Sequence, residues 1–249
     1  MKIIISPAKK MNVDTDNFSC KGLPVFLSRT KELMTYIKSL SYEEAKNLWS
    51  CNDKIAEQNF KRYAQMDLER GLTPAIISYE GIQYQYMSPM VFSEAGLDYV
   101  QNNLRILSGF YGILKPFDGV TPYRLEMQAK TSIGGFKDLY DYWGSLLYQE
   151  LTSDGDHIIL NLASKEYSKC IEKHLQPDDQ YITCIFGEEV NGKVVQKGTF
   201  AKMARGEMVR FLAENNISAP EGVKEFCGLG YEFSKKYSTE TEYVFIKKS

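Results

Sequence analysis

The chain has 249 residues, of which 43% are hydrophobic and 25% charged, and 30 basic against 32 acidic side chains give a net charge of −2. This composition is typical of a globular protein with a sizeable core. The near-neutral balance excludes a strongly cationic protein, so any affinity for nucleic acid must come from a local basic patch. No apolar run approaches the roughly 20 residues that span a bilayer, and the first apolar run is too short for a signal sequence. We therefore expect a cytoplasmic protein with no membrane partner.

Cysteine and histidine give no indication of a metal site. The five cysteines are far apart and no C-x-x-C occurs, and His157 and His174 are the only histidines. Zinc and iron–sulfur sites need closely spaced ligands of these types. We expect reduced cysteines, no metal and no cofactor.

The first half of the chain contains both strand and helix patterns. Aliphatic runs predict strands over residues 2–6 and 74–81. Apolar residues at helical spacing predict helices over residues 27–38, 42–50, 53–66 and 94–107. Ser41 and Glu44 form a capping box for the second helix. Ser93 is the expected N-cap of the fourth helix, and Gly109 lies just past its end.

The second half continues this alternation. Helices are expected over residues 136–151, 165–175 and 200–215, and strands over residues 157–164, 181–190, 193–198, 229–236 and 242–248. Asn191-Gly192 separates two of these strands and is a strong hairpin signal. No repeat or Pro/Gly/Ser linker divides the chain. The pattern predicts an α/β fold, with one compact domain over residues 1–249 and a mixed β-sheet core covered by helices.

The loop SPAKK, residues 6–10, follows the first predicted strand. Ligands in α/β folds often contact loops at such strand ends, and Lys9 is available there for an anion. The glycines of a phosphate loop are absent, so a solvated turn is the alternative interpretation.

The stretch LSGFYGILKPFDGVTPYRLEM, residues 107–127, follows the predicted helix 94–107. A helix followed by SGFYG resembles a helix–hairpin–helix, in which exposed loop amides bind DNA phosphates. Arg105 and Lys115 would add charge to such a site. Pro116 and Pro122 shorten the second helix, and a plain helix cap followed by a turn is the alternative.

Two further groups of polar residues are candidates for a pocket. In an extended PYRLEM segment, Arg124 and Glu126 would share a face, either as a surface ion pair or as an anion clamp beside a proton-transfer carboxylate. Asn161 lies within an apolar strand, and Ser164 is expected at a helix start whose amides suit an anion. No histidine is near Ser164, which argues against a serine-hydrolase mechanism.

Five basic residues lie close together in the sequence, in and just before the predicted helix 200–215. They are Lys193, Lys197, Lys202, Arg205 and Arg210. This is the clearest basic patch of a slightly acidic chain, and a solvated helix face is the alternative.

Five collinear stretches resemble the YaaA peroxide-stress family. They are residues 5–9, 104–127, 137–144, 161–167 and 202–211 (ISPAK, LRILSGFYGILKPFDGVTPYRLEM, KDLYDYWG, NLASKEY and KMARGEMVRF). The resemblance implies a cytoplasmic bacterial protein that limits oxidative damage linked to free iron and binds double-stranded and branched DNA. It implies one α/β unit with a helix–hairpin–helix at Ser108–Gly112 and a basic cleft, and it carries no established enzymatic activity.

Two functions remain open from the sequence. The first is non-sequence-specific DNA binding through phosphate contacts, with candidate residues Lys9, Arg105, Ser108, Gly109, Gly112, Lys115, Arg124, Lys202, Arg205 and Arg210. The second is an enzyme acting on a nucleotide or nucleobase. Its pocket, which would also suit a small anionic ligand, consists of Ser6, Lys9, Arg124, Glu126, Asn161 and Ser164. Iron storage is disfavoured, because no clustered His/Glu motif suits iron.

Overall fold

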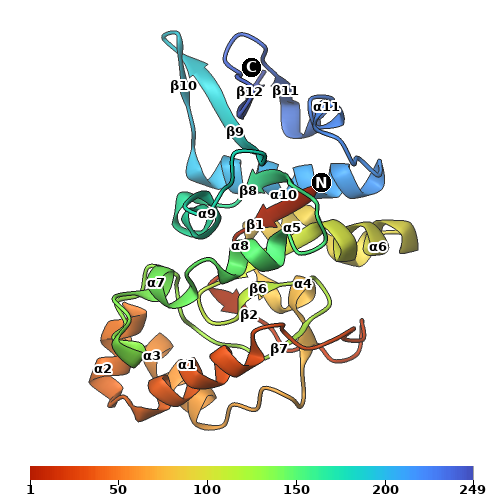
Figure 1. The fold of residues 1–249 in the computed structure, drawn as a ribbon. Helices are drawn as coiled ribbons and strands as arrows, with labels where there is room; N and C mark the ends of the chain where they lie inside the picture. The colour runs from red at the N-terminus through yellow and green to blue at the C-terminus, as the bar shows by residue number, and fades with distance from the viewer. Residues whose placement is uncertain (249) are drawn as a thin grey trace.

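An eight-stranded sheet runs through the centre of the computed structural model, which describes residues 1–248 (Figure 1). Seven strands follow the order β11-β12-β9-β8-β1-β5-β6, and β10 pairs with β9 beside them. Their bounds are β1 Lys2–Ile5, β5 Leu104–Ser108, β6 Gly112–Leu114, β8 Ile158–Leu162, β9 Gln180–Val190, β10 Lys193–Val195, β11 Tyr231–Phe233 and β12 Glu242–Lys247.

The first strand lies in the middle of this sheet. β1 is parallel to both neighbours, with Ile3 opposite Leu104 of β5 and opposite Leu160 of β8. β8, β9 and β12 continue the parallel part, whereas β6, β10 and β11 are antiparallel to their neighbours. The aliphatic side chains of β1 are fully buried on both faces, which explains its uninterrupted apolar run.

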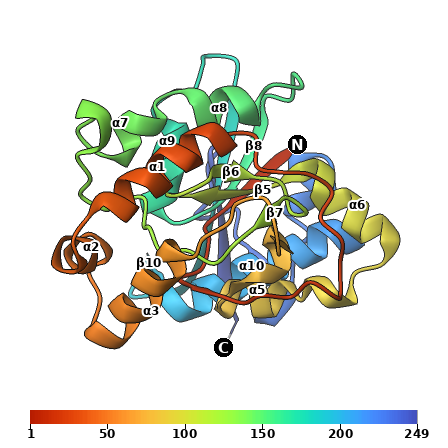
Figure 2. The ribbon, with the colours of Figure 1, turned by 90° about the horizontal axis from the view of Figure 1, so that it is seen from below.

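Helices cover both faces of the sheet (Figure 2). α8 and α9 lie on one side of the central strands, and α5, α6 and α10 lie on the other. The helices are α1 Leu27–Ser39, α2 Tyr42–Trp49, α3 Asp53–Ala64, α4 Ala75–Ser78, α5 Ile82–Met87, α6 Glu94–Asn103, α7 Leu139–Trp143, α8 Leu146–Leu151, α9 Lys165–Glu172, α10 Gly198–Glu214 and α11 Pro220–Val223. Short two-stranded pairs join β2 Lys10–Met11 to β4 Tyr79–Glu80 and β3 Thr73–Pro74 to β7 Gly119–Val120.

The α/β fold class with a mixed sheet is confirmed, as are β1, β8 and the hairpin of β9 and β10. At the tip of that hairpin Asn191 and Gly192 both have positive φ, 51° and 76°, the conformation that this pair of residues favours. The capping box of Ser41 and Glu44 is present at the start of α2. None of the helices within residues 1–248 is long and apolar enough to cross a bilayer.

The helix expected over residues 94–107 is too long, and this error removes the helix–hairpin–helix expected after it. Ser93 caps α6 as predicted, but the helix ends at Asn103 and β5 begins at Leu104. Ser108 pairs with Gly112 at the end of a β-hairpin formed by β5 and β6. Leu104 and Leu107 fit a helical stripe, but a strand buried on both faces carries the same apolar residues.

Two other elements differ from the prediction. Residues 74–81 contain the short helix α4 between β3 and β4, instead of one strand. The helix expected over residues 136–151 is divided into α7 and α8 at Gly144, whose φ of 50° and ψ of −132° do not fit an α-helix. A pair of helices with a short connection occurs instead at α2 and α3, which are joined by residues 50–52.

Candidate functional site

A cavity of about 410 Å³ lies at the carboxyl ends of β1 and β8, and we call it the strand-end cavity. Its walls come from the loop after β1, the start of α9, the β4–α5 segment, Glu126 and α10. The chain crosses from β1 to β5 on one side and from β8 to β9 on the other. Ligands of open α/β sheets bind at such a reversal of strand order.

Two serines join the loops that follow β1 and β8. The Ser6 hydroxyl donates a hydrogen bond to Ser164 Oγ at 3.1 Å, and Ser164 N donates one to Ser6 Oγ at 2.8 Å. The Tyr84 hydroxyl donates to the Ser6 carbonyl at 2.9 Å. Ser164 is the N-cap residue of α9, but its hydroxyl makes no capping bond to that helix.

Two cations from α10 line the strand-end cavity without ion-pair partners. Lys202 and Arg205 are three residues apart on this helix, and neither forms a salt bridge with any residue of 1–248. The Nε atom of Arg205 is buried and has no hydrogen-bond partner. Burial lowers the pKa of Arg205 below its ordinary value. An anionic ligand would satisfy both charges.

The carboxylates of the cavity differ in how they are paired. Glu126 lies 3.6 Å from the Nζ atom of exposed Lys9, and Glu80 lies 2.6 Å from the Nζ atom of Lys10. Glu166 accepts a hydrogen bond from Gln128 N at 3.2 Å. Burial, and then the nearby charge of Glu126, raise the pKa of Glu166, so this carboxyl holds a proton more readily than an exposed glutamate.

Gln83 lines the same cavity with an unsatisfied amide. The residue is only 7% exposed, and its Nε2 atom has no hydrogen-bond partner. A buried donor without a partner costs about 1–3 kcal/mol, so the position is unfavourable unless a ligand or solvent accepts its hydrogen. Gln83 is a polar wall residue that is available to a ligand.

Arg124 and Asn161, two of the predicted pocket residues, lie outside the lining. Residues 121–128 form no strand, and Arg124 is half-buried near Cys51, where its charge opposes the rise that burial causes in the thiol pKa. Asn161 is buried, with its Nδ2 donating to Thr183 Oγ1 at 3.2 Å and its Oδ1 accepting from Ala163 N at 2.9 Å. The expected pocket is therefore corrected at these two positions, and Ser6, Lys9, Glu126 and Ser164 are brought together.

Three residues predicted to bind DNA are corrected because they are buried. Ser108, Gly109 and Gly112 all lie in the core at the hairpin of β5 and β6. The amides of Phe110 and Tyr111 donate to Ser108 Oγ at 3.2 and 2.9 Å, so they are not free to bind phosphate. These glycines serve close packing instead, since a Cβ on Gly109 would lie 2.5 Å from the Leu125 carbonyl oxygen.

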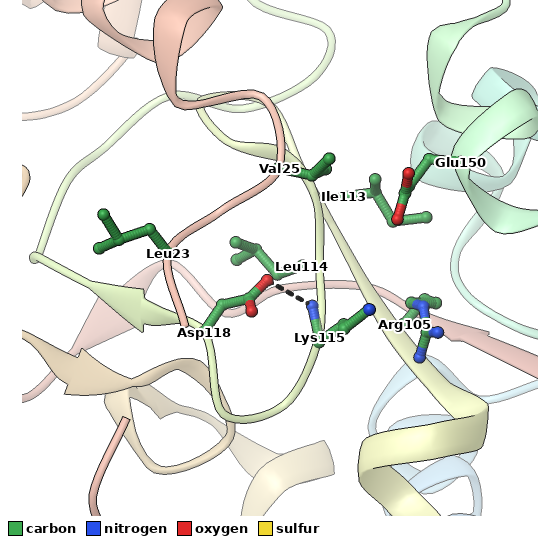
Figure 3. Close-up of a pocket in the computed structure, with 8 residues that line it drawn as sticks. All are labelled: Leu23, Val25, Arg105, Ile113, Leu114, Lys115, Asp118 and Glu150. Atoms are coloured by element: carbon green, nitrogen blue, oxygen red, sulfur yellow. Dashed lines mark hydrogen bonds between the residues drawn. The ribbon is translucent and has the colours of Figure 1, made fainter. Parts of the chain in front are cut away.

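Arg105 and Lys115 line a second, smaller cavity of about 100 Å³ together with Asp118 and Glu150 (Figure 3). Arg105 is buried near the amino end of β5, and its Nη1 donates to three carbonyls at 2.8–3.3 Å. Lys115 N donates to Asp118 Oδ2 at 2.8 Å. This cavity is separate from the residues at the carboxyl ends of the strands.

Arg210 pairs with Glu214 at 2.7 Å on α10 and does not line the strand-end cavity. Among residues 1–248, no three His, Cys, Asp or Glu side chains are grouped so as to hold a metal ion.

The lining also includes Gln83, Tyr84, Glu166 and Tyr167, none of which is predicted from the sequence. Glu166 lies two residues after Ser164, in the first turn of α9. Its position just after a serine at a strand end is a sequence signal that could have identified it. Gln83 and Tyr84 belong to a segment without a recognisable motif.

Comparison with known proteins bears out the resemblance. A family model described as peroxide stress protein YaaA matches residues 1–237. A UPF0246 protein of Agathobacter rectalis is 60% identical over 248 residues, which are 100% of this chain and 99% of the relative. UPF0246 proteins of Lachnoclostridium phytofermentans and Desulfitobacterium hafniense are 57% and 54% identical over 247 residues, which are 99% of this chain and 96% and 98% of the relatives. With nearly its whole length matched, this chain belongs to the YaaA family of peroxide stress proteins.

Proposed function

We propose that this protein acts in the cytoplasm during peroxide stress by binding double-stranded or branched DNA through phosphate contacts, and that it limits iron-dependent damage to the DNA it covers. The family description supports the stress response. Support for phosphate contact comes from Lys9, Lys202 and Arg205, which come from distant segments and line one cavity. The convergence of Lys202 and Arg205 without carboxylate partners is the observation that carries the proposal.

Phosphate-driven binding predicts a steep salt dependence and little dependence on sequence. Lys202 is exposed at the cavity, so its Nζ can reach a phosphate of a duplex outside. Lys202→Glu is expected to weaken binding and to reduce the slope of log affinity against log salt by about 1, the contribution of roughly one phosphate contact.

The test is an anisotropy titration with a duplex and a four-way junction over a range of salt concentrations. Arg210→Glu is the matched control, because Arg210 lies on the same helix away from the cavity. Circular dichroism verifies that both variants are folded. Salt-independent binding, or equal affinities for Lys202→Glu and the parent, contradicts the proposal.

A second candidate function is an enzyme acting on a nucleotide or nucleobase. It is favoured by Glu126 and Glu166, which lie in the same cavity as the cations. Non-specific phosphate binding has no use for carboxylates there, whereas proton transfer to or from a base uses a carboxyl with a raised pKa. The test is chromatography of nucleosides and nucleotides after incubation with the parent and with Glu166→Gln, and conversion by the parent alone is the expected result.

A further inference from the structure

The strand-end cavity is lined both by cations without ion-pair partners and by carboxylates. α10 carries Lys202 and Arg205, which have no ion-pair partner within residues 1–248. Glu126 and Glu166 line the same cavity, and the charge of Glu126 contributes to raising the pKa of Glu166. Lys9, another lining residue, lies 3.6 Å from Glu126. A ligand that satisfies both groups carries an anionic group and N–H donors.

The surroundings of these charges are already fixed by packing. α5 lies directly against α10, since a Cβ on Gly206 would be 2.1 Å from the Gln83 carbonyl oxygen. The backbone of Gln83 is therefore held beside the residue that follows Arg205, and the unpartnered Nε2 of Gln83 is a neutral donor in the same cavity. Arg205 and Gln83 both have a buried nitrogen without a hydrogen-bond partner and both line this cavity.

Aromatic walls complete the lining. Tyr84 and Tyr167 are both buried to 95%, and each contributes to the cavity. The Tyr84 hydroxyl is engaged with the Ser6 carbonyl, which fixes the ring. Aromatic rings next to hydrogen-bonding groups are the usual means of holding a nucleobase outside a helix.

We propose that the strand-end cavity binds a single nucleotide, with its phosphate on Arg205, Lys202 and Gln83 and its base N–H groups on Glu126 and Glu166. This inference rests on the second candidate function, from which it takes nucleotides as the class of ligand. It does not require catalysis. The volume of about 410 Å³ lies within the roughly 300–1,000 Å³ of ordinary small-ligand sites. Inorganic phosphate would offer no N–H donors to Glu126 and Glu166, and a nucleoside would offer no anion to Arg205.

The nucleotide has two possible sources with the same chemistry. It is either a free mononucleotide or a nucleotide displaced from a DNA strand, as in enzymes that extrude a base from the helix. Two competitors of AMP binding distinguish these sources: a duplex that contains a one-nucleotide bulge and a fully paired duplex.

The experiment is isothermal titration calorimetry of the full chain with AMP, adenosine and inorganic phosphate. AMP is expected to bind more tightly than either fragment. Arg205→Ala is expected to weaken AMP binding by about 10- to 100-fold, as loss of a charged hydrogen bond predicts, and to leave adenosine binding unchanged. Glu166→Gln is expected to weaken AMP and adenosine binding alike and to leave phosphate binding unchanged. Arg210→Ala is the matched control and is expected to behave as the parent.

Stronger competition by the bulged duplex than by the paired duplex identifies a displaced nucleotide, and equal or absent competition by the two duplexes identifies a free one. Absence of saturable AMP binding at millimolar concentration overturns the inference, as does equal AMP affinity of Arg205→Ala and Arg210→Ala. These results are independent of the DNA salt titration and of the product assay. AMP binding without turnover contradicts only the enzymatic candidate, and DNA binding without AMP binding contradicts only the inference drawn here.

Discussion

Ser6 and Ser164, which follow adjacent parallel strands, are joined by two hydrogen bonds in which the Ser6 hydroxyl is both donor and acceptor. Because Ser164 also begins α9, this pair fixes the start of that helix relative to the loop after β1. The two segments that form one wall of the strand-end cavity are therefore connected by a single hydroxyl group.

Ser6→Ala is expected to destabilise the fold more than Ser164→Ala. The first change removes both bonds and leaves Ser164 N without its acceptor, whereas the second retains the bond from Ser164 N to Ser6 Oγ. An unpaired buried donor costs about 1–3 kcal/mol, against about 1 kcal/mol for an ordinary lost bond. Urea unfolding of the two variants measures the difference, and equal losses of stability would contradict this assignment.

Gly206→Ala is expected to destabilise the protein by about 1–3 kcal/mol or more, because the added methyl group overpacks the contact of α10 with α5. The new Cβ would lie 2.1 Å from the Gln83 carbonyl oxygen, which belongs to backbone and cannot turn away. Gly198→Ala is the matched control on the same helix, since nothing lies within 4 Å of its added Cβ. That control is expected to be neutral or slightly stabilising, and thermal unfolding compares the two.

Asp118→Asn is expected to raise stability at neutral pH. Burial raises the pKa of Asp118 from 3.8 to about 6, so the folded state binds this proton more tightly than the unfolded state. The contribution of Asp118 to stability is therefore full below pH 3.8 and is lost as pH rises through about 6. The gain at pH 7 is at most about 3 kcal/mol, since one pKa unit corresponds to about 1.4 kcal/mol.

The measurement is urea unfolding of the parent and Asp118→Asn between pH 4 and pH 7. The amide can still accept the bond from Lys115 N that Figure 3 shows. The difference between the two proteins should grow as pH rises and disappear near pH 4. A difference that is constant across this range would show that Asp118 is not the titrating group.

Arg124→Ala is expected to leave AMP binding within twofold of the parent, because Arg124 does not line the strand-end cavity. It faces the region of Cys51 instead, where its Nε atom is buried without a partner. The same calorimetric titration that tests Arg205→Ala gives the comparison. A loss of AMP affinity equal to that of Arg205→Ala would place Arg124 in the site and refute the lining described above.

The proposed protection from iron damage is expected to need no iron site in the protein. Among residues 1–248, no group of three His, Cys, Asp or Glu side chains is arranged for a metal. Anaerobic calorimetry with Fe(II) is expected to show no tight, stoichiometric binding. One tight Fe(II) per chain, lost on mutation of a carboxylate, would contradict this expectation.

Elements could be predicted from the sequence where the local residue pattern is compatible with only one structure. β1 is a short aliphatic run ended by Pro7, and Asn191-Gly192 suits only a tight hairpin. The boundary between α6 and β5 could not be predicted, because Leu104 and Leu107 satisfy the helical and the buried-strand pattern equally. Burial on both faces of β5 is a property of the assembled sheet and leaves no periodicity to read.

The candidate site was predictable where its residues follow a strand. Ser6 and Ser164 stand at strand ends, and the sheet topology places such ends together. Strand alternation with Glu126 would place Arg124 in the pocket, but residues 121–128 form no strand. Gln83 acquires its position only through the packing of α5 on α10, which depends on Gly206, far along the chain.

The central position of β1 also has a consequence for synthesis on the ribosome. Ile3 is translated almost first, yet its partner Leu160 and the cation Arg205 come much later. At roughly 5–20 residues per second, β1 waits about 8 to 30 seconds for β8. During that interval the isoleucines of β1 lack the neighbouring strand that covers one edge, and exposed apolar segments of this kind favour aggregation. The strand-end cavity is complete only after α10 has emerged, so a truncated chain ending before α10 lacks Lys202 and Arg205.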